Sequence, residues 1–112
     1  MKLTKENLED IMVTALVGGI NYWVRHVKIS PDDQRKVRDN WNLFDAFANG
    51  IPLIIVESCE DNKEHIITPE MLSTGITKFK EIQGYSFDLE DFDSEGADTL
   101  IQITIFGELV YS

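Results

Sequence analysis

Carboxylate side chains are concentrated in one segment of this sequence, DLEDFDSEGAD at residues 88–98. Oxygen ligands at that density could hold Ca²⁺. Their spacing nevertheless lacks the D-x-D-x-D-G order of a calcium loop and its terminal bidentate glutamate. We therefore expect no metal ion here. The segment is interpreted either as a solvated acidic loop or as an electrostatic contact for a basic partner protein.

Aromatic side chains are interleaved with these acids. Large rings surrounded by charge suit the centre of a protein–protein interface, although they equally suit a loop that folds its rings down onto the core. The candidate partner-binding residues of this segment are Tyr85, Phe87, Asp88, Glu90, Asp91, Phe92, Asp93 and Glu95.

Basic side chains gather between residues 25 and 38, which hold five of the ten Lys and Arg residues. Phosphate groups are bound by Arg and Lys, so this region is the alternative ligand-binding candidate, for a nucleotide. Its members are Arg25, His26, Lys28, Arg35, Lys36 and Arg38.

The remaining residues with catalytic potential form no recognisable set. His26 and His65 are the only histidines, and no cluster of His, Cys and acids has zinc spacing. Cys59 lies among acids, which disfavour the thiolate that a nucleophile needs. The glycines of VGGI lack the spacing and the lysine of a phosphate-binding loop. We expect no catalytic residues, no cofactor and no enzymatic activity.

The charge balance narrows the choice of partner. The chain has 112 residues, with 20 Asp and Glu against 10 Lys and Arg, for a net charge of −10. Phosphate contacts need Lys and Arg, so we expect no direct nucleic-acid binding. The excess acid indicates a well-solvated surface or a basic protein partner. Without a signal-peptide pattern or an apolar run of roughly 18 residues, we expect one cytoplasmic domain over residues 1–112 and no membrane contact.

An amphipathic helix opens the chain. Apolar residues recur at steps of three and four, which predicts one helix from about Lys5 to Arg25, capped by Thr4. Gly18 and Gly19 interrupt it at a cost of roughly 1–2 kcal/mol in helix propensity. Gly19 lies on the apolar face, where a missing side chain lets another element come close. Packing of the following Tyr-Trp pair would compensate, and a hinge or a subunit contact is the alternative.

The rest of the chain alternates between strand and helix signals. Proline after a capping hydroxyl marks helix starts at Pro31 and Pro69, and β-branched runs mark strands. The expected elements are a short strand at 26–30, a helix at 31–48, a hairpin of strands at 51–58 and 64–68, a helix at 69–82 and an acidic loop at 83–98.

The last segment carries two patterns. Ile101, Ile103 and Ile105 alternate with polar residues as in a strand, whereas the spacing of Ala97, Ile101 and Ile105 also fits a helix, with Asp93 available as its cap. Periodicity alone slightly favours a strand.

Both ends of the chain resemble a known family. The stretches TALVGGINYW (14–23) and ADTLIQITIFGELVYS (97–112) resemble small, mostly uncharacterised phage and prophage proteins of Gram-positive bacteria. The resemblance covers most of the chain, with its motifs confined to the ends. It implies a helix over 95–110, a phage setting and an accessory role, but no catalytic or binding residues. Relatives often carry glutamate where this chain has Val17, so no role of that acid is carried over. If the ends pack together, Gly19 and Gly107 could let their helices cross closely.

We expect an α+β fold in which a small antiparallel sheet of two or three strands packs against three or four helices. The leading functional hypothesis is a non-enzymatic phage-encoded protein that inhibits a host defence factor. A basic nucleic-acid-handling complex such as CRISPR is the most natural target. The alternatives are a sponge that sequesters a nucleotide immune signal and a homo-oligomeric phage structural or assembly component.

Overall fold

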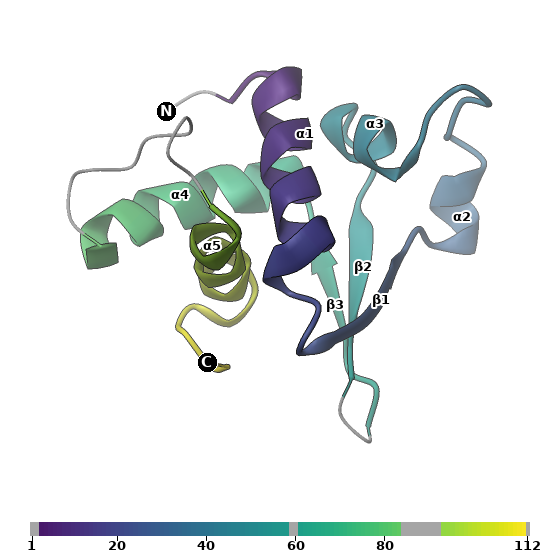
Figure 1. Ribbon diagram of the computed structural model, residues 1–112. Coiled ribbons are helices and arrows are strands. Elements are labelled where there is room, and N and C mark those ends of the chain that lie inside the picture. Colours follow the sequence, from purple (N-terminus) through teal and green to yellow (C-terminus); the bar gives the residue numbers. More distant parts are fainter. Residues whose placement is uncertain (1–2, 59–60, 84–92, 112) are drawn as a thin grey trace.

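The computed structural model describes residues 3–58, 61–83 and 93–111. Its architecture is α+β, with a three-stranded antiparallel sheet beside packed helices (Figure 1). The elements are α1 (Lys5–Thr14), the π-helix η1 (Ala15–Gly19), β1 (Val24–Lys28), α2 (Pro31–Gln34), α3 (Leu43–Ala48), β2 (Leu53–Glu57), β3 (Glu64–Ile67), α4 (Pro69–Gln83) and α5 (Ser94–Phe106). Within the described ranges, no helix combines the length and the apolar character needed to cross a membrane.

The sheet is built around the β-branched strand β2. This strand lies between β1 and β3 and pairs antiparallel with both. Ile55 at its centre faces Val27 of β1 on one side and His65 of β3 on the other. Branched side chains fit such a pleated, buried surface. The predicted hairpin of residues 51–58 and 64–68 is thereby confirmed, as is a strand before Pro31.

Helix α5 occupies the middle of the fold. It packs against α4, η1, α1 and β3, and Figure 1 shows it between α4 and α1. The crossing of α4 and α5 depends on Gly75, because a Cβ there would collide with the side chain of Thr104. The largest fully buried side chains are Trp23, Phe47, Ile11, Met12, Ile20, Leu53, Ile55, Ile67, Leu72, Ile76, Leu100 and Ile101.

The first helix is shorter than predicted. Thr4 caps it as expected, with its hydroxyl accepting from the Asn7 amide at 3.1 Å. The helix then widens into η1, where the Ile20 amide donates to the Ala15 carbonyl, and the helical part ends at Gly19. The prediction of a helix to Arg25 was therefore wrong. Two adjacent glycines weaken the helix there, and the chain turns so that β1 can begin at Val24.

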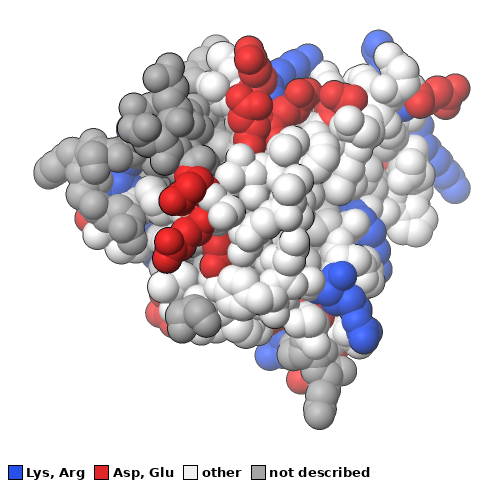
Figure 2. Space-filling model, in the orientation of Figure 1, with Lys and Arg blue, Asp and Glu red and all other residues white. Residues whose placement is uncertain are grey.

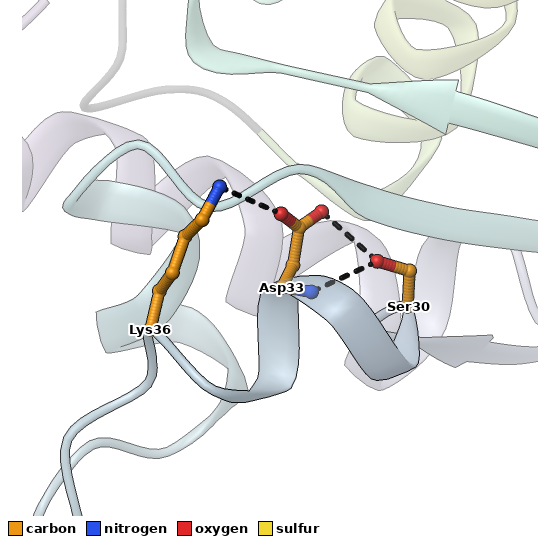
Figure 3. A network of polar contacts seen from close by, with 3 residues as sticks. All are labelled: Ser30, Asp33 and Lys36. Atoms are coloured by element: carbon orange, nitrogen blue, oxygen red, sulfur yellow. Dashed lines mark hydrogen bonds and ion pairs between the residues drawn. The ribbon is translucent and has the colours of Figure 1, made fainter.

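The predicted helix over 31–48 is two short helices, which brings the number of helices above the expected three or four. Ser30 caps α2 by accepting from the Asp33 amide at 3.2 Å, and Lys36 pairs with Asp33 at 3.2 Å (Figure 3). Asn42 then caps α3, accepting from the Asp45 amide at 2.8 Å. A second capping residue starts a new helix because its side chain satisfies the first free amides.

The last segment is a helix, as the family resemblance implied and against its local strand periodicity. Asp93 caps α5, accepting from the Gly96 amide at 2.8 Å. Gly107 ends it in the left-handed conformation, with φ 80°, which glycine adopts without strain. The predicted acidic loop at 83–98 is wrong at both of its ends, since residue 83 belongs to α4 and residues 94–98 belong to α5. Residue 93 is the cap of α5, and the rest of that prediction, over 84–92, lies outside the described residues.

Candidate functional site

The start of α5 lies directly on the turn formed by η1. A Cβ at Gly19 would lie 2.7 Å from the carbonyl oxygen of Ser94 and 3.4 Å from the amide nitrogen of Asp98. Only glycine permits this approach of two backbones. At Gly18 the nearest neighbour would be the Ser94 Cβ, at 3.8 Å, which is ordinary contact. The expectation of a close crossing is confirmed for Gly19, whereas Gly107 acts as a helix cap.

Asp98 is the centre of a polar network at this junction. Its side chain is buried, with 8% of the residue exposed. Its Oδ1 accepts from the Trp23 indole at 2.7 Å and from the Gln102 amide at 2.8 Å, and its Oδ2 accepts from the Tyr22 hydroxyl at 2.5 Å. The Tyr-Trp pair that follows the two glycines therefore binds the first turns of α5.

Gln102 extends the network to the segment that follows α5. Its Oε1 accepts from the amides of Val110 and Tyr111 at 2.8 and 2.7 Å, and its Nε2 donates to the Tyr111 carbonyl at 3.1 Å. The Tyr111 ring stacks on Trp23 with centroids 5.2 Å apart. Residues 110 and 111 are thereby held against the core by one fully buried amide.

Glu57 joins this segment to the sheet. Its carboxylate accepts from the Tyr111 hydroxyl and lies 2.6 Å from the His65 Nε2. Burial raises the pKa of Glu57, but the hydrogen bonds from His65 and Tyr111 outweigh burial and leave the pKa below its ordinary value. At the other end of the network, partial burial of Tyr22 together with its bond to Asp98 raises the pKa of its phenol to about 12.

A surface pocket of about 430 Å³ opens over the junction. We call it the junction pocket. It is lined by Gly18, Gly19, Tyr22, Ser94, Glu95, Asp98, Thr99, Leu109 and Tyr111. Two of the lining residues have exposed side chains with apolar surface: Tyr22 is 53% exposed and Leu109 is 52% exposed. Val17, which is 72% exposed, and Val110, which is 52% exposed, are next to lining residues in the sequence.

The charge around the junction pocket is acidic. Asp93 and Glu95 are exposed at the start of α5, and Figure 2 shows Asp and Glu side chains gathered there. No Lys or Arg belongs to the described lining of the pocket. The surface therefore combines a partly apolar concavity, four hydroxyl-bearing or carboxylate residues of α5 (Ser94, Glu95, Asp98 and Thr99) and an excess of negative charge.

The predicted partner-binding residues are only partly placed by the structure. Asp93 caps α5, and Glu95 lines the junction pocket. The other members of the predicted set, Tyr85, Phe87, Asp88, Glu90, Asp91 and Phe92, lie outside the described residues.

The alternative basic candidates lie on β1 and just after α2, and most are engaged by neighbours within the chain. Arg25 donates to Asn62 at 2.9 Å, Lys28 pairs with Glu64 at 3.0 Å, and Lys36 pairs with Asp33 at 3.2 Å. The guanidinium of Arg38 lies over the Trp41 ring at 5.5 Å.

A pocket of about 320 Å³ includes only Arg25 and His26 of the basic set. Arg35 is exposed on the turn after α2. Four of the six residues therefore make contacts within the chain, and this pocket gathers two of the six.

Among residues 3–58, 61–83 and 93–111, no group of three or more His, Cys, Asp and Glu side chains is arranged to hold a metal ion.

Sequence reasoning missed the network itself. Tyr22, Trp23, Asp98 and Gln102 were not among the predicted site residues. A usable signal was present, because Asp98 and Gln102 are polar residues four apart in a segment, 97–106, whose other members are apolar except for two threonines. Polar residues on the buried face of a helix need buried partners, and the indole and phenol donors of the Tyr-Trp pair were available.

Comparisons with protein-family models, with curated proteins and with solved structures found no match for this chain. The resemblance of its two ends to small phage proteins stays a prediction. The site is therefore interpreted from its own chemistry.

Proposed function

We propose that this chain is a non-enzymatic interaction protein that binds a basic protein partner through the surface around the junction pocket. One observation carries the proposal: the exposed side chains of Tyr22 and Leu109 line the same concavity as the exposed carboxylate of Glu95. Apolar anchors supply binding energy at an interface, whereas charge complementarity selects the partner and speeds association. An acidic, partly apolar surface fits a partner that presents Lys or Arg beside apolar residues.

The rigidity of this surface supports the same proposal. Glu95 extends from a helix whose start is fixed on Gly19 by backbone packing, and Leu109 lies in a segment that Gln102 holds in place. A preformed surface loses less conformational entropy on binding than a flexible one. The charged and apolar contacts are thus available to a partner without rearrangement of the fold.

We further propose that the partner is a host defence factor and that the chain is a phage-encoded inhibitor of it. The support is the net charge of −10 and the family resemblance of the two ends. A nucleic-acid-handling complex such as CRISPR exposes Lys and Arg for phosphates. An acidic protein that occupies those residues would block nucleic acid without binding it.

A pull-down from bacterial lysate with a salt-gradient elution tests the proposal. The informative variant is Asp93→Asn/Glu95→Gln, in which asparagine still caps α5. The control is Glu6→Gln/Asp10→Asn, which makes the same change in charge on the exposed face of α1. We expect the native chain and the control to retain a basic host protein up to the same salt concentration. The variant should release that protein at a lower salt concentration.

Two outcomes contradict the proposal. If the eluate contains no basic protein, the proposed basic partner is contradicted. If the variant and the control lose the partner at the same salt concentration, the surface around the junction pocket is not the binding site. Light scattering on the native chain completes the test, because a stable homo-oligomer whose interface covers the pocket would support the structural-component alternative instead.

A further inference from the structure

The carboxylate of Asp98 is buried, and its hydrogen-bond partners in the described part of the chain include no cation. All three of its hydrogen-bond donors, Tyr22, Trp23 and Gln102, are neutral. None of the ion pairs within the described part of the chain includes Asp98. A carboxylate offers about four acceptor positions, so three donors leave capacity for one more. Buried charge is costly unless it is paired.

The junction pocket gives that charge access to a ligand. Asp98 lines the pocket together with Glu95, a second carboxylate one helical turn earlier on α5. The Ser94 hydroxyl and the rings of Tyr22 and Tyr111 complete a lining that is both polar and apolar. At about 430 Å³ the pocket lies at the small end of the roughly 300–1,000 Å³ of ligand sites, a size for one long side chain.

We propose that the junction pocket binds a single arginine side chain of the partner, an inference that rests on the proposed function. A planar guanidinium has five donors in a fork that matches carboxylates and also stacks on aromatic rings. Its head would meet Glu95 and the open position of Asp98, while its aliphatic stem would lie against Leu109. Gly18 has no side chain to narrow the space that the arginine takes, and a Cβ there would have its nearest neighbour at 3.8 Å.

Nuclear magnetic resonance titration with N-acetyl-arginine amide tests this assignment on the full chain. We expect amide shifts confined to the pocket residues Gly18, Gly19, Glu95 and Thr99, with a dissociation constant on the order of 1 mM, as for a ligand of few atoms. The neutral isostere N-acetyl-citrulline amide should leave these amides in place. Glu95→Gln should weaken arginine binding roughly threefold to tenfold, since one of two carboxylates is lost.

The matched control is Glu6→Gln. Glu6 is exposed in the first turn of α1, as Glu95 is exposed in the first turn of α5, so both changes remove one charge from a helix start. The inference is overturned if citrulline binds as well as arginine, if the shifts lie elsewhere, or if Glu6→Gln weakens binding as much as Glu95→Gln.

The two proposals fail separately. Arginine binding in the pocket without a basic host protein in the pull-down would overturn only the proposed function. A basic host protein whose retention depends on Asp93 and Glu95, together with an unresponsive pocket in the titration, would overturn only the arginine assignment.

Discussion

The indole nitrogen of Trp23 donates to the Oδ1 of Asp98 at 2.7 Å, although 75 positions separate the two residues in the chain. This bond joins the turn after η1 to the second turn of α5. Both residues are buried, so the bond is shielded from water. If one of the two side chains were removed, no water could take its place as the hydrogen-bond partner of the other.

Replacing Asp98 with alanine should destabilise the fold strongly. The change leaves the Trp23 indole and the Gln102 amide without their acceptor in the core, and we expect a loss of roughly 2–4 kcal/mol in the free energy of unfolding. Urea denaturation measures it. Tyr22→Phe is the control: Tyr22 is 53% exposed, so its loss should cost less than about 1 kcal/mol. Equal losses in the two variants would contradict a network centred on Asp98.

The two adjacent glycines should respond in opposite directions to alanine. At Gly19 the new Cβ would lie 2.7 Å from a backbone oxygen, and the helices must move apart, at a cost of roughly 1–3 kcal/mol. At Gly18 there is room, and alanine should stabilise the protein by up to about 1 kcal/mol through helix propensity. Thermal unfolding of both variants checks the sign, and two stabilised variants would show that the close approach is not required.

Replacing Gln102 with leucine should release the segment after α5 while leaving the helix folded. The variant removes the acceptor of the Val110 and Tyr111 amides, so their hydrogen-exchange protection should fall towards that of open chain. Thr99→Ala removes a hydrogen bond elsewhere on α5 and should leave both amides protected. Retained protection in the leucine variant would mean that the side chain of Tyr111, through its stacking on Trp23 and its hydrogen bond to Glu57, is enough to hold the segment.

Acid should weaken the native protein partly through Glu57. Its pKa is lowered on folding from an ordinary value of 4.5, so its contribution to stability is complete above that value and is lost as the pH falls through the folded pKa. The Glu57→Gln variant should therefore lose less stability on acidification than the native chain. Urea midpoints at neutral pH and below pH 4.5 make the comparison, with exposed Glu6→Gln as control. Parallel pH profiles would be inconsistent with a lowered pKa.

Tyr22 should titrate in strong alkali. Its pKa rises from 10.0 to about 12, so the bond to Asp98 contributes fully below pH 10 and is lost as the pH rises towards 12. The difference between the ultraviolet titration curves of the native chain and of Tyr22→Phe isolates this phenol, provided that circular dichroism shows the fold intact. A midpoint near 10 would rule out the burial and the hydrogen bond as described.

Local signals in the sequence predicted most elements, because capping and strand propensity act over a few residues. Thr4, Pro31 and Pro69 begin helices as predicted, and the β-branched run at Leu53 forms the central strand. The helix continued to Arg25 in the prediction because its apolar spacing continues. The chain instead leaves the helix at Gly19, where two adjacent glycines weaken it and the backbone of α5 packs against it. The glycines are visible in the sequence, whereas the contact with α5 is not.

The candidate site was largely beyond sequence reasoning for the same reason. Asp93 and Glu95 were predicted from charge density, but the pocket beside them is formed by η1 and by the segment at Leu109. Bringing these segments together depends on contacts between residues more than 70 positions apart, such as Trp23 with Asp98. The concentration of acids in the sequence identifies an acidic surface. It does not identify the apolar residues that lie next to that surface in the fold.

The packing of η1 against α5 also has a consequence for synthesis. Residues 19 and 94 are separated by 75 positions, which a ribosome adds in roughly 4–15 s at about 5–20 residues per second. During that interval the apolar side of α1 and the indole of Trp23 have no α5 to cover them. The growing chain must avoid aggregation through these uncovered apolar groups until α5 emerges. A rise in the burial of tryptophan would mark the moment when α5 packs on η1.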